Sequence, residues 1–145
     1  MLARRGFVLM AAAGAVIPSV AGATPEEVRA LIRAVAGDAG AKPGRVKLEV
    51  PQLVENGNAV AMELTLGADV PAGVVLTDIH VFADGNPRPD VAHFRFGSRA
   101  GVPKVATRIR LSTSQTVHAL AVFADGSCWH DSVNLIVAIS ACLDD

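Results

Sequence analysis

The sequence lacks several features that mark common classes of protein. Its 13 basic and 14 acidic residues are scattered along the chain, whereas nucleic-acid binding needs a clustered basic surface. No apolar run reaches the roughly 20 residues that span a bilayer. There is no internal repeat and no phosphate-binding glycine loop, and Ser112, Ser114 and Ser127 lie in turn-like stretches without a nucleophile-elbow motif. Nucleic acid and membrane are therefore not expected partners, and a serine-hydrolase triad is not expected.

The histidines also lack the spacing of a metal site. His80, His93, His118 and His130 each lie in or beside an expected strand, and no two stand at the short separation typical of zinc ligands. We therefore predict no metal and no resident cofactor, and we expect these side chains to lie on strand surfaces or in the packing. Convergence in three dimensions stays open.

The first 23 residues have the pattern of an export signal. Arg4 and Arg5 precede an apolar stretch over 7–17, and the small residues of 21–23 form a cleavage site. The paired arginines followed by Phe7 are typical of a twin-arginine signal, which exports folded proteins. An ordinary secretory signal is the alternative, and both predict the bacterial periplasm. Processing before Thr24 would leave 122 of the 145 residues, with 11 basic and 14 acidic side chains.

The mature chain is predicted to form one domain over 24–139, with a helix over 25–36 and a sandwich over 45–139. Thr24 and Glu27 form a capping box, proline occupies the first helical position, and apolar residues then recur at helical spacing. From Arg45 onward the apolar period becomes two, with turn residues such as Asp125-Gly126 between the segments. The expected strands are 46–50, 60–66, 74–83, 91–96, 104–111, 116–124 and 128–139.

Seven short strands in about 100 residues predict an antiparallel β-sandwich of immunoglobulin-like architecture. The helix is then expected outside the sandwich or across one end. The last strand is unusually apolar from Val133 to Ile139, and such strands are covered on both faces. A partner subunit is therefore a reasonable inference.

The two cysteines stand at opposite ends of that last strand. In an oxidising compartment a disulfide is the first interpretation. A strand over 128–139 would, however, hold Cys128 and Cys142 roughly 40 Å apart, while a disulfide needs Cα atoms within about 7 Å. A bulge near residues 132–134 could bring the two cysteines together, so a disulfide stays possible. Otherwise Cys128 is a small packing residue and Cys142 is a free thiol on an exposed end.

A free thiol on a tail beyond a rigid domain suits a carrier. Such a tail can enter the active site of another enzyme, take up a group through an S–S bond and present it to the next enzyme. The domain then needs no catalytic residues of its own. We expect Val133–Ile139 to position the arm formed by residues 140–145.

Three stretches carry a resemblance to a known family. "RVKLEVPQLVENGNAV", "DIHVFADGNPRPDVAHFRF" and "ATRIRLSTSQTVHALAVFADGS" resemble the thiosulfate-oxidation carrier protein SoxY over nearly the whole mature chain. The resemblance implies an immunoglobulin-like domain that pairs with a SoxZ-like subunit and carries covalent sulfur on a cysteine near the C-terminus, here Cys142. It further implies loading by a c-type cytochrome enzyme, sulfate release by a metal-dependent hydrolase, and oxidation of the retained sulfur by a molybdenum dehydrogenase.

The tail departs from the Gly-Gly-Cys-Gly-Gly pattern of that family. Ser140, Ala141, Leu143 and Asp144 replace the glycines, and Asp145 is added, so the arm should be stiffer and thicker. The nearby carboxylates oppose thiolate formation, but a basic pocket on a partner enzyme would turn them into docking anchors. Leu143 could seat the tip in an apolar mouth. The alternative is a divergent SoxY-like binding or assembly module that carries nothing.

Overall fold

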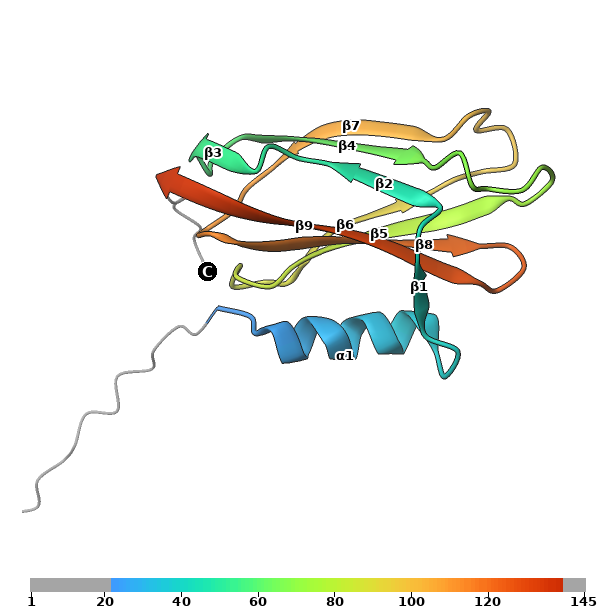
Figure 1. Ribbon diagram of the computed structural model, residues 1–145, viewed down its shortest axis with the longest axis horizontal. Coiled ribbons are helices and arrows are strands. Elements are labelled where there is room, and N and C mark those ends of the chain that lie inside the picture. Colours follow the sequence, from blue (N-terminus) through green and yellow to red (C-terminus); the bar gives the residue numbers. More distant parts are fainter. Residues whose placement is uncertain (1–21, 140–145) are drawn as a thin grey trace, which may run out of the picture.

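The computed structural model describes residues 22–139 and contains there one helix and nine strands (Figure 1). The helix predicted over 25–36 is confirmed as α1 (Pro25–Ala36). The strands are β1 (Ala41–Pro43), β2 (Val46–Glu49), β3 (Leu53–Asn56), β4 (Val60–Leu66), β5 (Leu76–Ala83), β6 (Asp90–Arg95), β7 (Lys104–Ile109), β8 (Gln115–Phe123) and β9 (Cys128–Ile139).

The strands form two sheets that pack face to face, which confirms the predicted sandwich. The larger sheet has the order β1-β9-β8-β5-β6, with β3 also paired to β9, and the smaller sheet has the order β2-β4-β7. Figure 1 shows the smaller sheet on one side of the core and the larger sheet between the core and α1. The chain passes between the layers three times along one edge, as β1, β2, β3 and β4 follow one another.

All seven predicted strands are present, and β1 and β3 are two short additions. Both pair with β9 in parallel, β1 opposite Cys128–His130 and β3 opposite residues 136–139. Each is only three or four residues long, too short to display an apolar alternation of its own. The two additions cover the edge of β9 at its two ends.

The core lies between the two sheets and is built from alternate residues of each strand. Leu64 on β4, Val81 on β5 and Val117 on β8 are buried without measurable exposure. Because side chains of a strand point alternately to opposite faces, the intervening residues lie on the outer faces. On the larger sheet these outward residues include all four histidines, which follows from the pairings of His80 with His93 and of Leu120 with His130.

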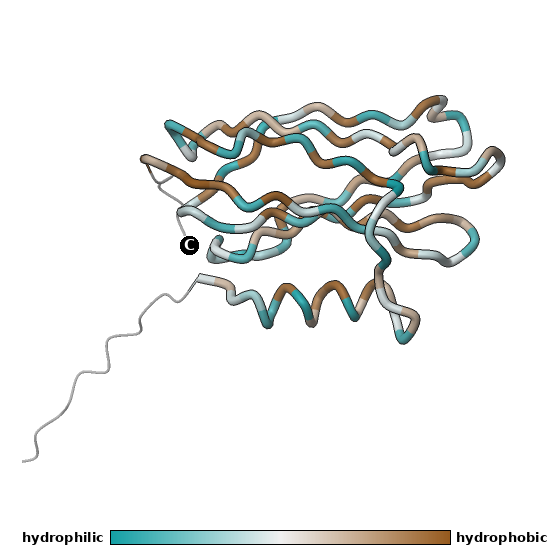
Figure 2. Tube along the Cα trace, viewed as in Figure 1, coloured by the Kyte–Doolittle hydropathy of each residue, from teal (hydrophilic) through white to brown (hydrophobic). Residues whose placement is uncertain are grey.

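Helix α1 lies on the outer face of the larger sheet, one of the two positions expected for it. The Thr24 hydroxyl accepts from the Glu27 N–H, and the Glu27 carboxylate accepts from the Thr24 N–H, which completes the capping box. Val28 is fully buried in a second apolar cluster with Phe82, Leu120 and Cys128 of the sheet. Figure 2 shows apolar residues recurring along the helix. Without the sheet this amphipathic segment would be marginal.

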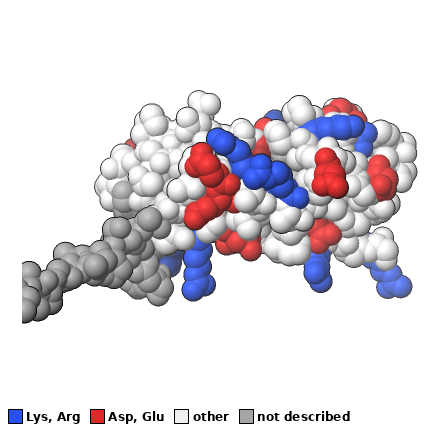
Figure 3. All heavy atoms as spheres, turned by 90° about the horizontal axis from the view of Figure 1, so that it is seen from below, with Lys and Arg blue, Asp and Glu red and all other residues white. Residues whose placement is uncertain are grey.

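The surface on the helix side carries charges of both signs. Figure 3 shows Lys and Arg side chains interspersed with Asp and Glu over this face. No helix among residues 22–139 combines the length and apolar character needed to cross a bilayer.

Candidate functional site

The C-terminal end of β9 is held by backbone and side-chain contacts up to its last residue. The Ile136 N–H donates to the Gln52 carbonyl at 2.8 Å, and the Gly57 N–H donates to the Ile139 carbonyl at 2.9 Å. Between them, the Val137 N–H donates to the Ser114 hydroxyl at 2.9 Å. The strand is therefore anchored from both neighbours, β3 on one side and the start of β8 on the other, to within three residues of Cys142.

The predicted attachment residue and its arm lie outside the described residues. Cys142, with Ser140, Ala141, Leu143 and Asp144, follows directly on Ile139, the last residue of β9. The structure thus defines the position of Ile139, the base of the arm. It lies at the end of the sandwich opposite the β8–β9 hairpin (Figure 1).

A substitution at Ser114 tests how the base of the arm is held. We expect Ser114→Ala to cost about 1 kcal/mol, because it removes the acceptor of the Val137 N–H. Amide hydrogen exchange should rise at Val137. Ser114→Thr keeps the hydroxyl and serves as the matched control. Equal exchange rates at Val137 in the alanine variant and the parent would contradict this role for Ser114.

Cys128 lies at the other end of β9, beneath the helix, and is a buried free thiol. Burial, together with the negative charge of Asp125, raises the pKa of Cys128 above its usual value. Because the thiolate is the reactive form, this thiol is held in its inert state. The interpretation of Cys128 as a small packing residue is confirmed.

The path of β9 argues against a disulfide between the two cysteines. The ladder with β8 runs without a register shift from Cys128 to Leu135, so the bulge near 132–134 that would allow a disulfide is not present. Eleven residue steps at about 3.3 Å place Cys128 and Ile139 roughly 36 Å apart. The three further residues up to Cys142 span at most about 11 Å. The chain is too short to turn back.

An exposed apolar group lies on the outer face beside the base of the arm. Leu53 on β3 and Ile136 on β9 are directly paired in the ladder, which places their side chains on the same outer face. They are 66% and 62% exposed. Ile139 is 63% exposed, but it follows Ile136 by three residues and therefore belongs to the other face of the strand. The apolar stretch from Val133 to Ile139, for which cover on both faces is expected, is covered in this chain on its core side, whereas α1 covers β9 at Cys128. Over its second half the outward side chains are uncovered in this chain.

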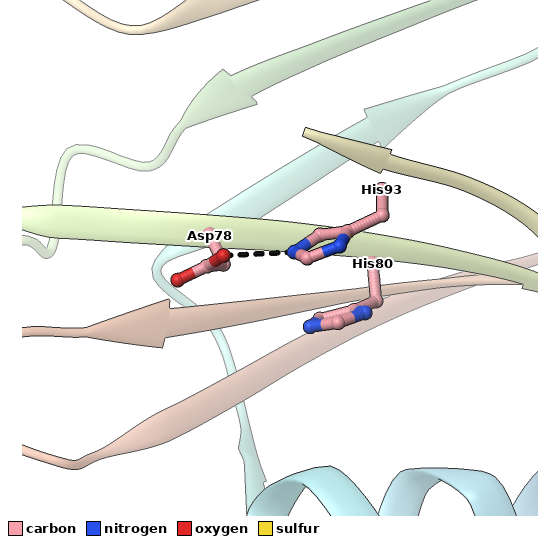
Figure 4. Close-up of side chains that lie close together, drawn as sticks. All are labelled: Asp78, His80 and His93. Atoms are coloured by element: carbon pink, nitrogen blue, oxygen red, sulfur yellow. Dashed lines mark hydrogen bonds and ion pairs between the residues drawn. The ribbon is translucent and has the colours of Figure 1, made fainter. Parts of the chain in front are cut away.

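The histidines do not all remain isolated, and two of them meet on the outer face of β5 and β6. His80 and His93 are directly paired across these strands, with their rings stacked at 4.0 Å between centroids. The carboxylate of Asp78, two residues before His80 on the same face, accepts a hydrogen bond from His93 Nε2 at 2.8 Å. Figure 4 shows the His93 ring directed at Asp78, with His80 alongside.

Sequence spacing alone missed this cluster because its third member lies on a neighbouring strand. The only sequence signal is Asp-x-His over 78–80, which places two polar groups on one face of a strand. Burial and the nearby charge of His93 lower the pKa of His80. For Asp78, burial opposes ionisation, but hydrogen bonds from His93 and Thr77 outweigh it and lower the pKa.

The other two histidines lie on β8 and β9. His118 stands 3.6 Å from the Asp84 carboxylate, and burial, partly offset by Asp84, lowers its pKa. His130 is paired with Leu120 on the face that carries the helix. These two match the expectation of surface and packing histidines.

The three serines considered for a triad hold turns and strand ends. Ser112 Oγ donates to the Gly85 carbonyl at 2.8 Å, and Ser127 Oγ donates to the Asp125 carboxylate at 2.6 Å. Ser114 accepts from Val137 as described above. Each of these hydroxyls therefore has a local structural partner.

Comparison with known proteins identifies the family and the fold. The family model described as "Sulfur oxidation protein SoxY" matches residues 32–142, a range that includes Cys142. No curated protein matches the chain.

Solved structures share the fold at low sequence identity. The sulfur carrier protein SoxY from Chlorobium limicola f thiosulfatophilum is 23% identical, with a TM-score of 0.57, over 75% of this chain and 96% of that one. A superoxide reductase (neelaredoxin) from Ignicoccus hospitalis is 16% identical, with a TM-score of 0.55, over 81% of this chain and 95% of that one. These structures show that the sandwich is shared among proteins with different names. The family match, which extends over most of the sequence from the helix to the tail, shows that this chain belongs to the SoxY family of sulfur oxidation proteins.

Proposed function

We propose that this chain is a periplasmic sulfur carrier that holds covalent sulfur intermediates of thiosulfate oxidation on Cys142. The observation that carries the proposal is the anchoring of β9 through Ile139, three residues before Cys142, while the other cysteine of the chain is packed beneath the helix. A firm base with a short arm can present a thiol to several enzymes in turn. The family match, which ends at Cys142, supports the same residue.

The chemistry needs no catalytic residue from this chain. In loading, the Cys142 thiol loses its proton and its sulfur forms an S–S bond with the outer sulfur of thiosulfate. The electron pair released passes to a c-type cytochrome. In the next step a hydrolase uses water to cleave the bond to the sulfonate sulfur, so that sulfate and two protons leave and a persulfide stays on Cys142. A molybdenum dehydrogenase would oxidise the outer sulfur of the persulfide to a sulfonate, in which water supplies the three oxygen atoms while six protons are released and six electrons pass to an electron acceptor.

The proposed partner is a SoxZ-like subunit, and the exposed apolar group of Leu53 and Ile136 on the outer face is its proposed contact on this chain. Exposed apolar side chains gathered in one place mark interaction surfaces. The group lies beside the base of the arm, so a partner seated there would also shape the surroundings of Cys142. The same group also supports the second candidate function, a SoxY-like assembly module without cargo. Such a module needs a surface for a partner but no sulfur adduct.

Intact-mass spectrometry of the protein purified from thiosulfate-fed cells distinguishes the two functions. We expect adducts of one or more sulfur atoms, or of thiosulfonate, on the parent protein. They should be absent in Cys142→Ser and present in Cys128→Ala, the matched control at the buried thiol. An unmodified mass in the parent would favour the assembly module. A mass two hydrogens lower that reduction restores would indicate a disulfide and would also contradict carriage.

A further inference from the structure

The cluster of Asp78, His80 and His93 has a structural origin that is independent of the arm. The antiparallel pairing of β5 and β6 sets His80 directly opposite His93, and the two-residue period of β5 brings Asp78 to the same outer face. The cluster lies on β5 and β6, which β8 separates from β9. Its properties can therefore be tested apart from sulfur carriage.

The three side chains offer their ligand atoms within a small space. One nitrogen from each histidine and one oxygen of Asp78 all lie within 4.8 Å of one another. A tetrahedral ion with bonds of about 2.0–2.2 Å holds its ligand atoms roughly 3.4 Å apart. The widest separation in the cluster must therefore shrink by at most about 1.4 Å. His93 and Asp78 already lie at 2.8 Å, so the larger adjustment falls on His80.

We propose that Asp78, His80 and His93 form a binding site for a divalent transition-metal ion of the zinc type. Two imidazole nitrogens and one carboxylate oxygen suit Zn²⁺ and its neighbours, whereas Mg²⁺ and Ca²⁺ prefer oxygen ligands alone. Three protein ligands leave the fourth position to water. The His93 side chain is 33% exposed, which gives the ion an approach from solvent.

Two features of the site limit its affinity. The imidazole rings are nearly parallel, at 13°, and ring nitrogens direct their lone pairs in the ring plane, so at least one ring must turn to meet the ion. Arg95 Nε also lies 3.6 Å from the Asp78 carboxylate and brings a competing positive charge. The Arg95 side chain is 84% exposed and can move into solvent. We expect a Kd in the micromolar range, with one ion per chain.

Calorimetric titration with ZnCl₂ tests the site on the mature protein. The titration uses Cys142→Ser as the parent, because the thiol of the tail is itself a zinc ligand. We expect one saturable site, and His93→Gln should weaken it at least 10-fold. His118→Gln is the matched control, because His118 also lies beside an aspartate but has no second histidine paired with it across the strands. Its affinity for Zn²⁺ should equal that of the parent.

Nuclear magnetic resonance of the imidazole nitrogens locates the ion. In the presence of Zn²⁺ the ring nitrogen signals of His80 and His93 should shift, while those of His118 and His130 stay in place. The proposal is wrong if no saturable binding occurs, if the shifts fall on His118 or His130, or if a folded His93→Gln protein binds Zn²⁺ as well as the parent. Should that variant fail to fold, His80→Gln provides the same comparison. None of these results alters the intact-mass test of Cys142.

Discussion

We expect thiosulfate-dependent oxygen uptake to fall at least 100-fold when Cys142 is replaced by serine in the host strain. The expected loss is nearly complete because a hydroxyl cannot form the S–S bond to thiosulfate, and every later step acts on that bond. The measurement compares oxygen uptake in strains that carry the parent gene or the variant as their only copy. Immunoblotting of the exported protein establishes that both strains contain equal amounts.

The buried cysteine provides the control for this experiment. Cys128 is enclosed by the helix and makes no contact with the end of β9 that carries the arm. Cys128→Ala should therefore keep uptake within about 2-fold of the parent. Strong uptake by the Cys142→Ser strain would show that sulfur is carried elsewhere or that the chain only assembles its partners. Loss of uptake in Cys128→Ala, with uptake kept in Cys142→Ser, would place the cargo on Cys128 and overturn the assignment.

The elements with a strong local signal could be predicted from the sequence. The helix follows from its capping box and apolar stripe, and both are present at the expected residues. β4 alternates because one face meets the core, and β8 does so up to His118, before Leu120 is buried beneath the helix. The length of the strand predicted over 128–139 indicates that Cys128 and Cys142 lie far apart unless a bulge intervenes, and the ladder without a register shift from Cys128 to Leu135 excludes that bulge.

The features that depend on long-range pairing could not be predicted. β1 and β3 are too short to show a period, and their partner is β9, which lies at the far end of the described chain. The meeting of His80 with His93 depends on the register between β5 and β6, which neither strand specifies alone. The contacts by which Gly57 and Ser114 anchor the end of β9 could not be predicted either, because each of them joins segments that are distant in sequence.

The position of the helix links the stability of the fold to the inertness of Cys128. Val28 is fully buried against Phe82, Leu120 and Cys128. A charge at this position can be accommodated in two ways: it can remain unpaired in the apolar cluster, at a cost of several kcal/mol, or the helix can leave the sheet. If the helix leaves the sheet, the loss of stability cannot exceed the free energy of helix docking. The Cys128 thiol is then exposed.

Val28→Asp should therefore lower the stability of the domain and make Cys128 reactive. We expect a loss of about 3 kcal/mol or more, because the substitution removes a buried apolar side chain and opposes docking with a charge. For a domain of this size that corresponds to a fall in Tm of about 10–15 °C. In the Cys142→Ser background, alkylation by iodoacetamide reports on Cys128 alone, and mass spectrometry should show at least 100-fold faster modification.

An exposed position on the same helix separates the effect of the charge from that of its location. Ala30 faces solvent, so Ala30→Asp introduces the same charge into the same helix without entering the cluster. Its Tm should lie within about 3 °C of the parent, and its thiol should stay unreactive, since a surface substitution changes stability by about 0.5 kcal/mol. Slow alkylation of Cys128 in Val28→Asp at an unchanged Tm would mean that Val28 does not hold the helix against the sheet. Fast alkylation in the parent would mean that the helix leaves the sheet without any substitution.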